Sequence, residues 1–211
     1  MIMLANNDIL RYSKLVNVIF FMGDKNMNFY KSEQSGRSMV EMLGVLAIIG
    51  VLSVGGIAGY SKAMAKFKLS KAMDQVSMLV ANIRTLYSGQ RSYSGLNNKN
   101  AISFGVVPSE MASGTSTITN AFSSNVTVTA AGTDDLHFTV KFEGLGKEAC
   151  VSMTTADWGS GSGSGLVGIA PSSTATAGTQ VTGSNLPVSL TTAASACDCA
   201  ASTCSITWEY Y

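Results

Sequence analysis

Charged residues are scarce in this sequence. Aspartate, glutamate, lysine and arginine together make up 13% of its 211 residues, and the formal net charge is only +1. A surface that binds nucleic acid needs clustered positive charge to neutralise phosphates, and this composition does not supply it. We therefore expect no nucleic-acid partner. The length is sufficient for one domain with its own core and an appended segment.

Histidine is nearly absent, and familiar catalytic patterns are missing. His137 is the single histidine, and the sequence contains no H-E-x-x-H, G-x-S-x-G or phosphate-loop motif. Asp134 and Asp135 are adjacent carboxylates, but calcium requires more oxygen ligands, so a solvated turn is expected there. Trp158 and Trp208 are expected to pack in a core rather than bind sugars. We predict no enzymatic activity, no cofactor and no metal site.

Proline is also scarce, and none of the three prolines lies within residues 37–90. One continuous helix of about fifty residues, roughly 75 Å long, is therefore possible there. Residues 42–61 contain no charged side chain, which is about the length that crosses a bilayer. Residues 61–88 place apolar side chains at spacings of three and four, as an amphipathic helix does. We expect residues 37–61 to span a membrane and residues 62–90 to pack on a folded domain.

A lone glutamate precedes the charge-free stretch, and glycines recur within it. Burying the carboxylate of Glu41 without a partner would be costly. Gly55 and Gly59 have the small-xxx-small spacing that lets membrane helices approach closely. We interpret the glycines as helix-packing positions, although glycine is also common in membrane helices that pack on nothing. The glycines of the stretch are Gly44, Gly50, Gly55, Gly56 and Gly59.

The second half of the sequence is rich in serine, threonine, alanine and glycine, which favours turns and strands. Residues 124–130 and 136–142 alternate apolar with polar or small side chains on either side of the turn-like AGTDD, and predict an antiparallel hairpin. Residues 205–211 alternate in the same way and predict a terminal strand. Residues 147–158 are compatible with a short helix. The glycine–serine tract at residues 159–165 predicts a flexible loop.

All four cysteines lie in the C-terminal third, at Cys150, Cys197, Cys199 and Cys204. An even number in a polar region indicates disulfides formed in an oxidising compartment. The spacing C-x-C-x4-C differs from the C-x2-C pairs that usually hold zinc. A one-residue gap disfavours a bridge between Cys197 and Cys199. We favour a bridge from Cys150 to Cys197, so that the other two close a tight turn, and pairing of Cys150 with Cys199 stays open.

The lysines and the cysteines predict opposite locations for the C-terminal domain relative to a membrane. Four lysines follow the apolar stretch, and by the positive-inside rule they would keep the C-terminal domain in the cytoplasm. Disulfides instead require that residues 91–211 lie outside it. The domain is rich in threonine and poor in lysine, so we place it outside. The lysines are Lys62, Lys66, Lys68 and Lys71.

Residues 36–41 read Gly-Arg-Ser-Met-Val-Glu and lead directly into the apolar stretch. This arrangement resembles the type IV prepilin signature, in which a leader ends in glycine, glutamate is the fifth mature residue and a hydrophobic helix follows. Further along, the tyrosine-containing loop at 93–96, the segment at 107–111 and the later Cys150 look like the type IVb pilin plan. The resemblance covers most of residues 36–211.

The resemblance implies an α+β fold, in which a long N-terminal helix packs on an antiparallel β-sheet. It also implies that residues 1–36 are a leader. A prepilin peptidase would cut between Gly36 and Arg37 and would methylate the new terminus at Arg37. Arg37 departs from the family pattern, whose first mature residue is commonly hydrophobic. A start at Met27 would leave the short leader MNFYKSEQSG, which is closer to the family pattern. Residues 1–26 are therefore expected to be an over-extended start.

The resemblance further implies assembly into a helical filament. Glu41 would pair with the terminal amine of Arg37 in a neighbouring copy and so fix the axial register, whereas the alternative places Glu41 in the headgroup region. The implied partners are copies of this chain, the prepilin peptidase, an inner-membrane platform and an assembly ATPase. The subunit would lie in the inner membrane and later in an extracellular pilus or a periplasmic pseudopilus. The alternatives are a type II secretion pseudopilin, a minor pilin and an anchored extracellular binding domain that does not polymerise.

Overall fold

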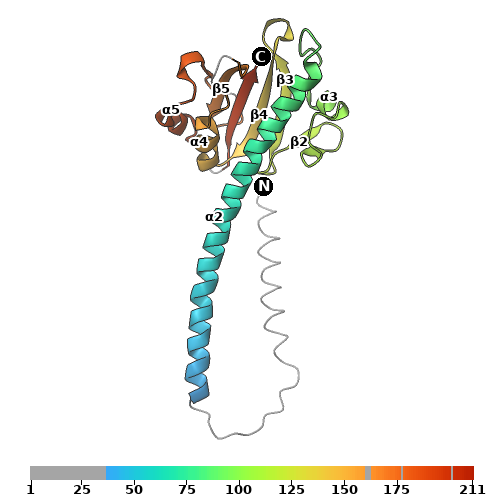
Figure 1. The fold of residues 1–211 in the computed structure, drawn as a ribbon. Helices are drawn as coiled ribbons and strands as arrows, with labels where there is room; N and C mark the ends of the chain where they lie inside the picture. Colours follow the sequence, from blue (N-terminus) through green and yellow to red (C-terminus); the bar gives the residue numbers. More distant parts are fainter. Residues whose placement is uncertain (1–36, 160–162, 177, 201) are drawn as a thin grey trace. The chain divides into compact units, whose positions relative to one another are not determined.

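The computed structural model describes residues 37–159, 163–176, 178–200 and 202–211. The predicted leader therefore lies outside the described residues. The chain divides into two compact units, one ending at Gly56 and one running from Ile57 to Tyr211. Helix α2 (Arg37–Tyr87) begins in the first unit and ends in the second (Figure 1). Its 51 residues contain no proline, which would break the helical hydrogen bonding.

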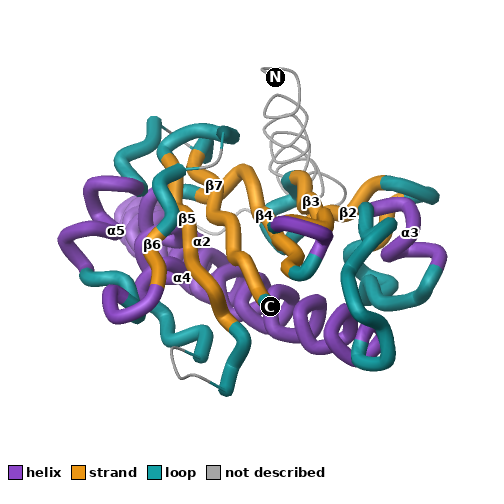
Figure 2. The backbone as a smooth tube through the Cα atoms, turned by 90° about the horizontal axis from the view of Figure 1, so that it is seen from above, coloured by secondary structure: helices purple, strands orange, loops and turns teal. Residues whose placement is uncertain are grey.

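The described part of the second unit contains one seven-stranded antiparallel sheet (Figure 2). The strand order is β1-β2-β3-β4-β7-β5-β6, so the last strand in the sequence lies between β4 and β5. The strands are β1 (Ala112–Ser113), β2 (Thr117–Thr119), β3 (Asn125–Ala131), β4 (His137–Leu145), β5 (Leu166–Ser172), β6 (Val181–Thr182) and β7 (Cys204–Tyr210). The long helix and the antiparallel sheet confirm the predicted α+β fold.

The predicted hairpin is confirmed as strands β3 and β4, with Val128 opposite Val140. The turn between them uses three residues with positive φ: Gly132 at 79°, Asp134 at 59° and Asp135 at 55°. Glycine, aspartate and asparagine are the residues that adopt this conformation at least cost. Asp134 is exposed, as expected for a solvated turn.

Three short helices accompany the sheet: α3 (Asn98–Ser103), α4 (Lys147–Thr155) and α5 (Leu190–Ala196). The side chain of Asn97 caps α3 by accepting from the backbone N–H of Asn100, and Ser189 caps α5 in the same way through Thr192. Helix α4 begins where the sequence predicts a helix and ends three residues earlier. Two short 3-10 segments occupy Thr133–Asp135 and Gly183–Asn185.

The hydrophobic core forms between the second half of α2 and one face of the sheet. The buried side chains of α2 recur at spacings of three and four, which places them on one side of the helix. On the sheet, Phe142 and Trp208 are fully buried with ring centroids 5.7 Å apart, and Trp158 packs on Trp208 at 5.2 Å. Both tryptophans are therefore packing residues, as predicted. The buried apolar residues of α2 are Ala72, Val76, Leu79, Val80 and Ile83.

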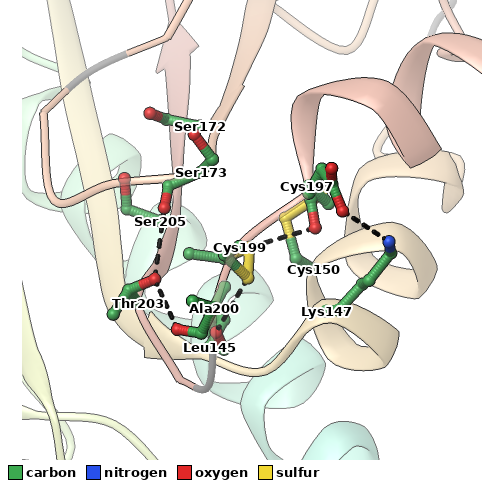
Figure 3. The surroundings of a disulfide bond; sticks show 12 residues. Leu145, Lys147, Cys150, Ser172, Ser173, Cys197, Cys199, Ala200, Thr203 and Ser205 are labelled. Atoms are coloured by element: carbon green, nitrogen blue, oxygen red, sulfur yellow. Dashed lines mark hydrogen bonds and ion pairs between the residues drawn. A yellow bond between two sulfur atoms is a disulfide. The ribbon is translucent and has the colours of Figure 1, made fainter.

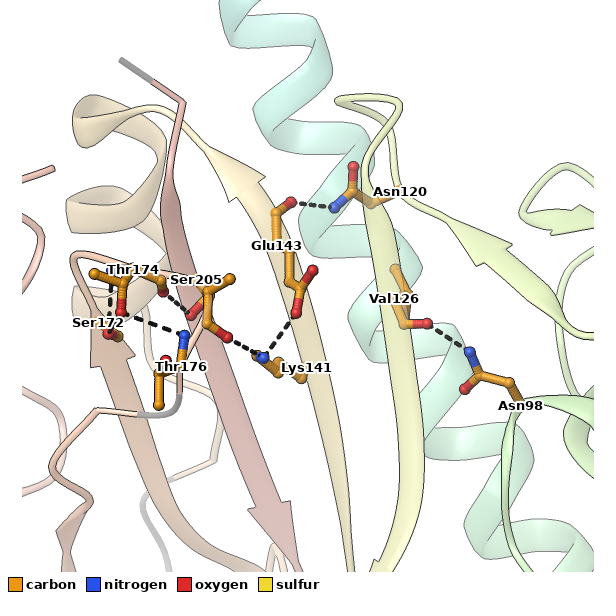
Figure 4. A network of polar contacts seen from close by, with 10 residues as sticks. Asn98, Asn120, Val126, Lys141, Glu143, Ser172, Thr174, Thr176 and Ser205 are labelled. Atoms are coloured by element: carbon orange, nitrogen blue, oxygen red, sulfur yellow. Dashed lines mark hydrogen bonds and ion pairs between the residues drawn. The ribbon is translucent and has the colours of Figure 1, made fainter. Parts of the chain in front are cut away.

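Side-chain amides attach the segment between α2 and β3 to the sheet (Figure 4). Asn98 donates to the carbonyl of Val126 at 2.8 Å and accepts from the N–H of Val128 at 2.7 Å. Asn120 donates to the carbonyl of Glu143 at 2.9 Å. These bonds pair backbone groups of β3 and β4 with side-chain amides, so they fix this segment on the sheet.

Gln75 is the buried polar residue that joins α2 to that segment. Its side chain is 2% exposed, donates to the carboxylate of Glu110 at 3.0 Å and accepts from the backbone N–H of Ala121 at 2.9 Å. One side chain therefore satisfies a carboxylate and a backbone donor that lie 11 residues apart in sequence.

We predict that Gln75→Leu lowers the free energy of unfolding by about 1–3 kcal/mol, because the N–H of Ala121 is left without its partner. Urea denaturation of the full chain in detergent measures the change. The exposed Gln90 provides a matched control, and Gln90→Leu should change the stability by less than about 0.5 kcal/mol. Equal effects of the two variants would contradict the assigned role of Gln75.

Candidate functional site

The expected processing site lies at the start of α2. Gly36 is outside the described residues, and Arg37 is the first residue of the helix. The cut between these residues and the methylation of Arg37 therefore stay predictions.

The first half of α2 exposes its apolar side chains on all sides. Every residue from Glu41 to Gly56 is exposed, with Val51 at 75% and Leu43 at 67%. Among the described residues this is the one helix long and apolar enough to cross a membrane, with a mean hydropathy of 2.2 in its most apolar window. Exposed apolar surface of this extent indicates a lipid or protein environment around the helix.

The hydroxyl groups of two serines in the first half of α2 are satisfied by the helix itself. Ser53 donates to the carbonyl of Ile49 at 2.7 Å, and Ser61 donates to the carbonyl of Ala58 at 3.0 Å. Bonds of this kind remove the cost of an unpaired hydroxyl in an apolar environment. These serines can therefore lie in an apolar environment without an unpaired hydroxyl.

The glycines of α2 have no packing role within the described chain. A Cβ atom built at any of the five would meet nothing within 4 Å beyond the adjoining helix backbone. Glycine in a helix interior nevertheless costs about 0.5–1 kcal/mol relative to alanine. We infer that the space beside these glycines is for a partner outside the described chain. They are Gly44, Gly50, Gly55, Gly56 and Gly59.

Three of these glycines share one face of the helix with Glu41. At about 100° per residue, Glu41, Gly44, Gly55 and Gly59 fall within a sector of about 60°. Gly50 lies at least about 120° outside that sector. The side chain of Glu41 is exposed and makes no ion pair with any other side chain that the structure describes from residue 41 onward. The carboxylate and the small residues thus form one strip along which a second helix could lie.

Beyond the apolar stretch, one of the four lysines forms an ion pair with another residue that the structure describes. Lys71 lies 3.1 Å from the carboxylate of Glu110, which Gln75 also contacts. Hydrogen bonds from Gln75 and Lys71 lower the pKa of Glu110 below its ordinary value of 4.5. Lys62, Lys66 and Lys68 are exposed.

The lowered pKa of Glu110 gives a pH-dependent contribution to stability. A carboxyl whose folded-state pKa is depressed stabilises the fold above its unfolded pKa and loses that contribution as pH falls through the folded value. We predict that wild type is more stable than Glu110→Gln at pH 7, and that the difference disappears as the pH falls below 4.5. Urea midpoints measured across pH test this. Glu148→Gln, at an exposed site, is the control. A difference that persists in acid would contradict the prediction.

The four cysteines form two neighbouring disulfides. Figure 3 shows the bridge between Cys150 and Cys197 with its surroundings. Cys150 in α4 is bonded to Cys197 at the end of α5, and Cys199 is bonded to Cys204 at the start of β7. Of the two pairings that the spacing leaves open, this is the one that we favour from the sequence. The first bridge joins positions 47 residues apart, across the segment that contains β5, β6 and α5. It therefore ties the late part of the chain to the centre of the domain.

The surroundings of the bridges are closely packed. Cys150, Cys197 and Cys204 are fully buried, and their sulfur atoms lie within 4.8 Å of one another. All three sulfurs are in disulfides, so they are not the thiolates that metal binding requires. On the surface nearby, Lys147 forms an ion pair with Asp198 at 2.7 Å and lowers the pKa of that carboxyl.

Comparisons with known proteins agree on one family. The family model described as PilS N terminal matches residues 67–209. The major structural subunit of bundle-forming pilus, from Escherichia coli O127:H6 and from Escherichia coli O111:H-, is in each case 31% identical over 140 residues. Each match covers 65% of this chain and 72% of the relative.

Two solved structures share the fold. The type IV b pilin from Salmonella typhi matches with a TM-score of 0.50 and 22% identity, over 67% of this chain and 98% of that chain. TcpA, a type IV pilin from Vibrio cholerae El Tor biotype, matches with a TM-score of 0.50 and 14% identity, over 68% and 99%. The family model spans more than half of this chain, and the identity to the bundle-forming pilus subunit extends over most of that relative. The chain therefore belongs to the PilS N-terminal family and is a type IV pilin with the fold of the type IVb pilins.

Proposed function

We propose that this chain is a structural subunit of a type IVb pilus and polymerises through the first half of α2. The observation that carries the proposal is the strip formed by Glu41, Gly44, Gly55 and Gly59 on an exposed apolar helix. Small side chains let helices approach closely, and a carboxylate in an apolar bundle is tolerated when it meets an opposite charge. The relatives named as major subunits of the bundle-forming pilus support the same role.

The partner of Glu41 in this proposal is the terminal amine of Arg37 in a neighbouring copy. A prepilin peptidase cuts after Gly36, and the amine that it releases is methylated and stays positively charged. Pairing of that amine with Glu41 offsets the cost of two charges among apolar helices and fixes one axial register between subunits. Gly44, Gly55 and Gly59 then pack against the adjoining helix, whereas Gly50 and Gly56 face other neighbours.

The subunit is held in the inner membrane before assembly, with residues 37–61 as its anchor and the disulfide-bonded domain outside the cytoplasm. An inner-membrane platform and an assembly ATPase then extract it into the filament. Its function is structural and needs no catalytic residue. Helix assembly replaces lipid contacts of α2 with contacts to other copies, so the exposed apolar surface stays covered at each stage.

Expression of the chain with a prepilin peptidase and an assembly machinery tests the proposal. Sheared surface material examined by electron microscopy should contain filaments that antibodies to residues 91–211 label along their length. Label confined to filament ends would indicate a minor pilin, and short periplasmic filaments would indicate a pseudopilin. If the chain stays in the membrane fraction as a stable monomer, it is an anchored binding domain and the proposal fails.

A further inference from the structure

A cavity of about 360 Å³ lies at the C-terminal end of α2, within the second unit. Its walls come from the last turn of α2, the loop that follows it, Leu136 just before β4 and Tyr211 just after β7. This volume is within the range of small-molecule sites and is sufficient for one sugar-sized ring. The residues that matter for its chemistry are Arg84, Tyr87, Arg91, Tyr93 and Tyr211.

The cavity is positively charged. Two arginines line it, and none of the described side chains in its wall is acidic. Arg84 donates one hydrogen bond to the carbonyl of Ser164 at 2.5 Å, which fixes its position and leaves other donors available. Arg91 is exposed and makes no side-chain hydrogen bond or ion pair with any described residue. A guanidinium of this kind is suited to bind a carboxylate through two parallel hydrogen bonds.

Aromatic rings form a rigid wall beside the arginines. The rings of Tyr87 and Tyr93 lie 5.2 Å apart, and Tyr93 packs on the buried Phe138 at 4.7 Å. The backbone N–H of Tyr93 also donates to the carbonyl of Asp135 at 2.7 Å. The hydroxyls of Tyr87 and Tyr93 have no hydrogen-bond partner among the described residues. Burial raises the pKa of both phenols, so each hydroxyl is protonated and available as a donor at neutral pH.

From this combination we propose that the cavity binds an acidic sugar, with its carboxylate on Arg91 and Arg84 and its ring against Tyr87 and Tyr93. Serine and glutamine side chains in the wall provide partners for the sugar hydroxyls. The cavity is open to solvent on one side, and its volume of about 360 Å³ fits a single ring better than an extended acidic peptide, since the peptide would need a long groove. The site is separate from the helix strip that carries assembly, so it does not depend on the proposed polymerisation.

Ligand-observed saturation-transfer NMR on the full chain in detergent tests the site. The probe is N-acetylneuraminic acid, and the matched neutral sugar is its methyl ester, which keeps the skeleton and removes the negative charge. We expect transfer to the acidic sugar and little to the neutral one. Arg91→Gln should weaken binding about tenfold or more, because it removes a charge-assisted pair. Tyr87→Phe, which keeps the ring and removes the donor, should weaken it less.

Lys99→Gln is the matched control, since it removes one exposed positive charge outside the cavity and should leave binding unchanged. Equal binding of the neutral sugar, or undiminished binding by Arg91→Gln, would overturn the proposal. A hexaglutamate peptide provides the competing ligand. If the peptide binds in an Arg91-dependent manner and the sugar does not, the cavity recognises acidic protein segments and the proposal is wrong.

Discussion

Replacing Glu41 by alanine will abolish filament assembly and leave the disulfide-bonded domain folded. In the proposed filament the carboxylate matches the terminal amine of a neighbouring Arg37, and its removal leaves that amine unpaired among apolar helices. Breaking a buried pair in this way costs about 3–5 kcal/mol. That is about a hundredfold or more in the association constant for each contact. Sheared filament mass, measured by immunoblotting of surface fractions, should fall accordingly.

The same variant should leave the monomer intact, because Glu41 belongs to the first unit and makes no ion pair with any other side chain that the structure describes from residue 41 onward. Membrane levels of the subunit and its urea midpoint are therefore expected to match wild type. Glu148→Ala removes a carboxylate from an exposed position in α4 and should assemble normally. Normal filament yield from Glu41→Ala would show that Glu41 remains hydrated at the membrane boundary, and the pairing account would be wrong.

Removing the bridge between Cys150 and Cys197 will destabilise the domain more than removing the bridge between Cys199 and Cys204. The two bridges close loops of very different length, with sequence separations of 47 and 5 residues. Loop-closure entropy predicts losses of about 4 kcal/mol for the long bridge and about 2 kcal/mol for the short one. Urea denaturation of the two double alanine variants, without reductant, measures both values under the same conditions.

The long bridge also determines how the late part of the chain is held. Its loss frees α5 from α4, and β5 and β6 lie in the segment between the two cysteines. Amide hydrogen exchange in residues 166–196 should therefore rise in the Cys150→Ala, Cys197→Ala variant and stay close to wild type in the other. A larger loss of stability from the short bridge would contradict the loop-closure argument.

Local sequence patterns were sufficient to predict the elements in which apolar side chains recur with a clear period. The alternation in residues 124–130 and 136–142 predicted the β3–β4 hairpin, and the last seven residues predicted β7 to within one position. In both cases one face is fully buried, so the period of two is clear in the sequence. The amphipathic spacing of α2 was readable for the same reason.

Strand β5 and helix α5 were not predicted, because tertiary contacts stabilise them. Strand β5 contains Gly168 and Pro171, which weaken the strand signal, and it is held between β7 and β6. Helix α5 has seven residues rich in threonine and alanine, too few to be stable alone. Its cap at Ser189 and the disulfide at Cys197 supply what its own propensity lacks.

The residues of the candidate sites differ in how well the sequence alone could predict that they lie together. Glu41, Gly44, Gly55 and Gly59 lie within twenty residues of one helix, so helical geometry alone places these four on one strip. Gln75 was not predicted. It is a polar residue on the apolar face of the amphipathic helix, and this position could have indicated its buried role. Arg84 and Tyr211 are brought to one cavity by the central placement of β7, which no local pattern specifies.

The central claim is that this chain is processed after Gly36 and polymerises through α2. Mass spectrometry of the intact subunit in purified surface filaments tests it most directly. The account predicts that the filament consists of this chain beginning at Arg37, with a mass increased by one methyl group and decreased by the four hydrogens lost in two disulfides. A chain that is found only in the membrane and still carries residues preceding Arg37 would contradict it.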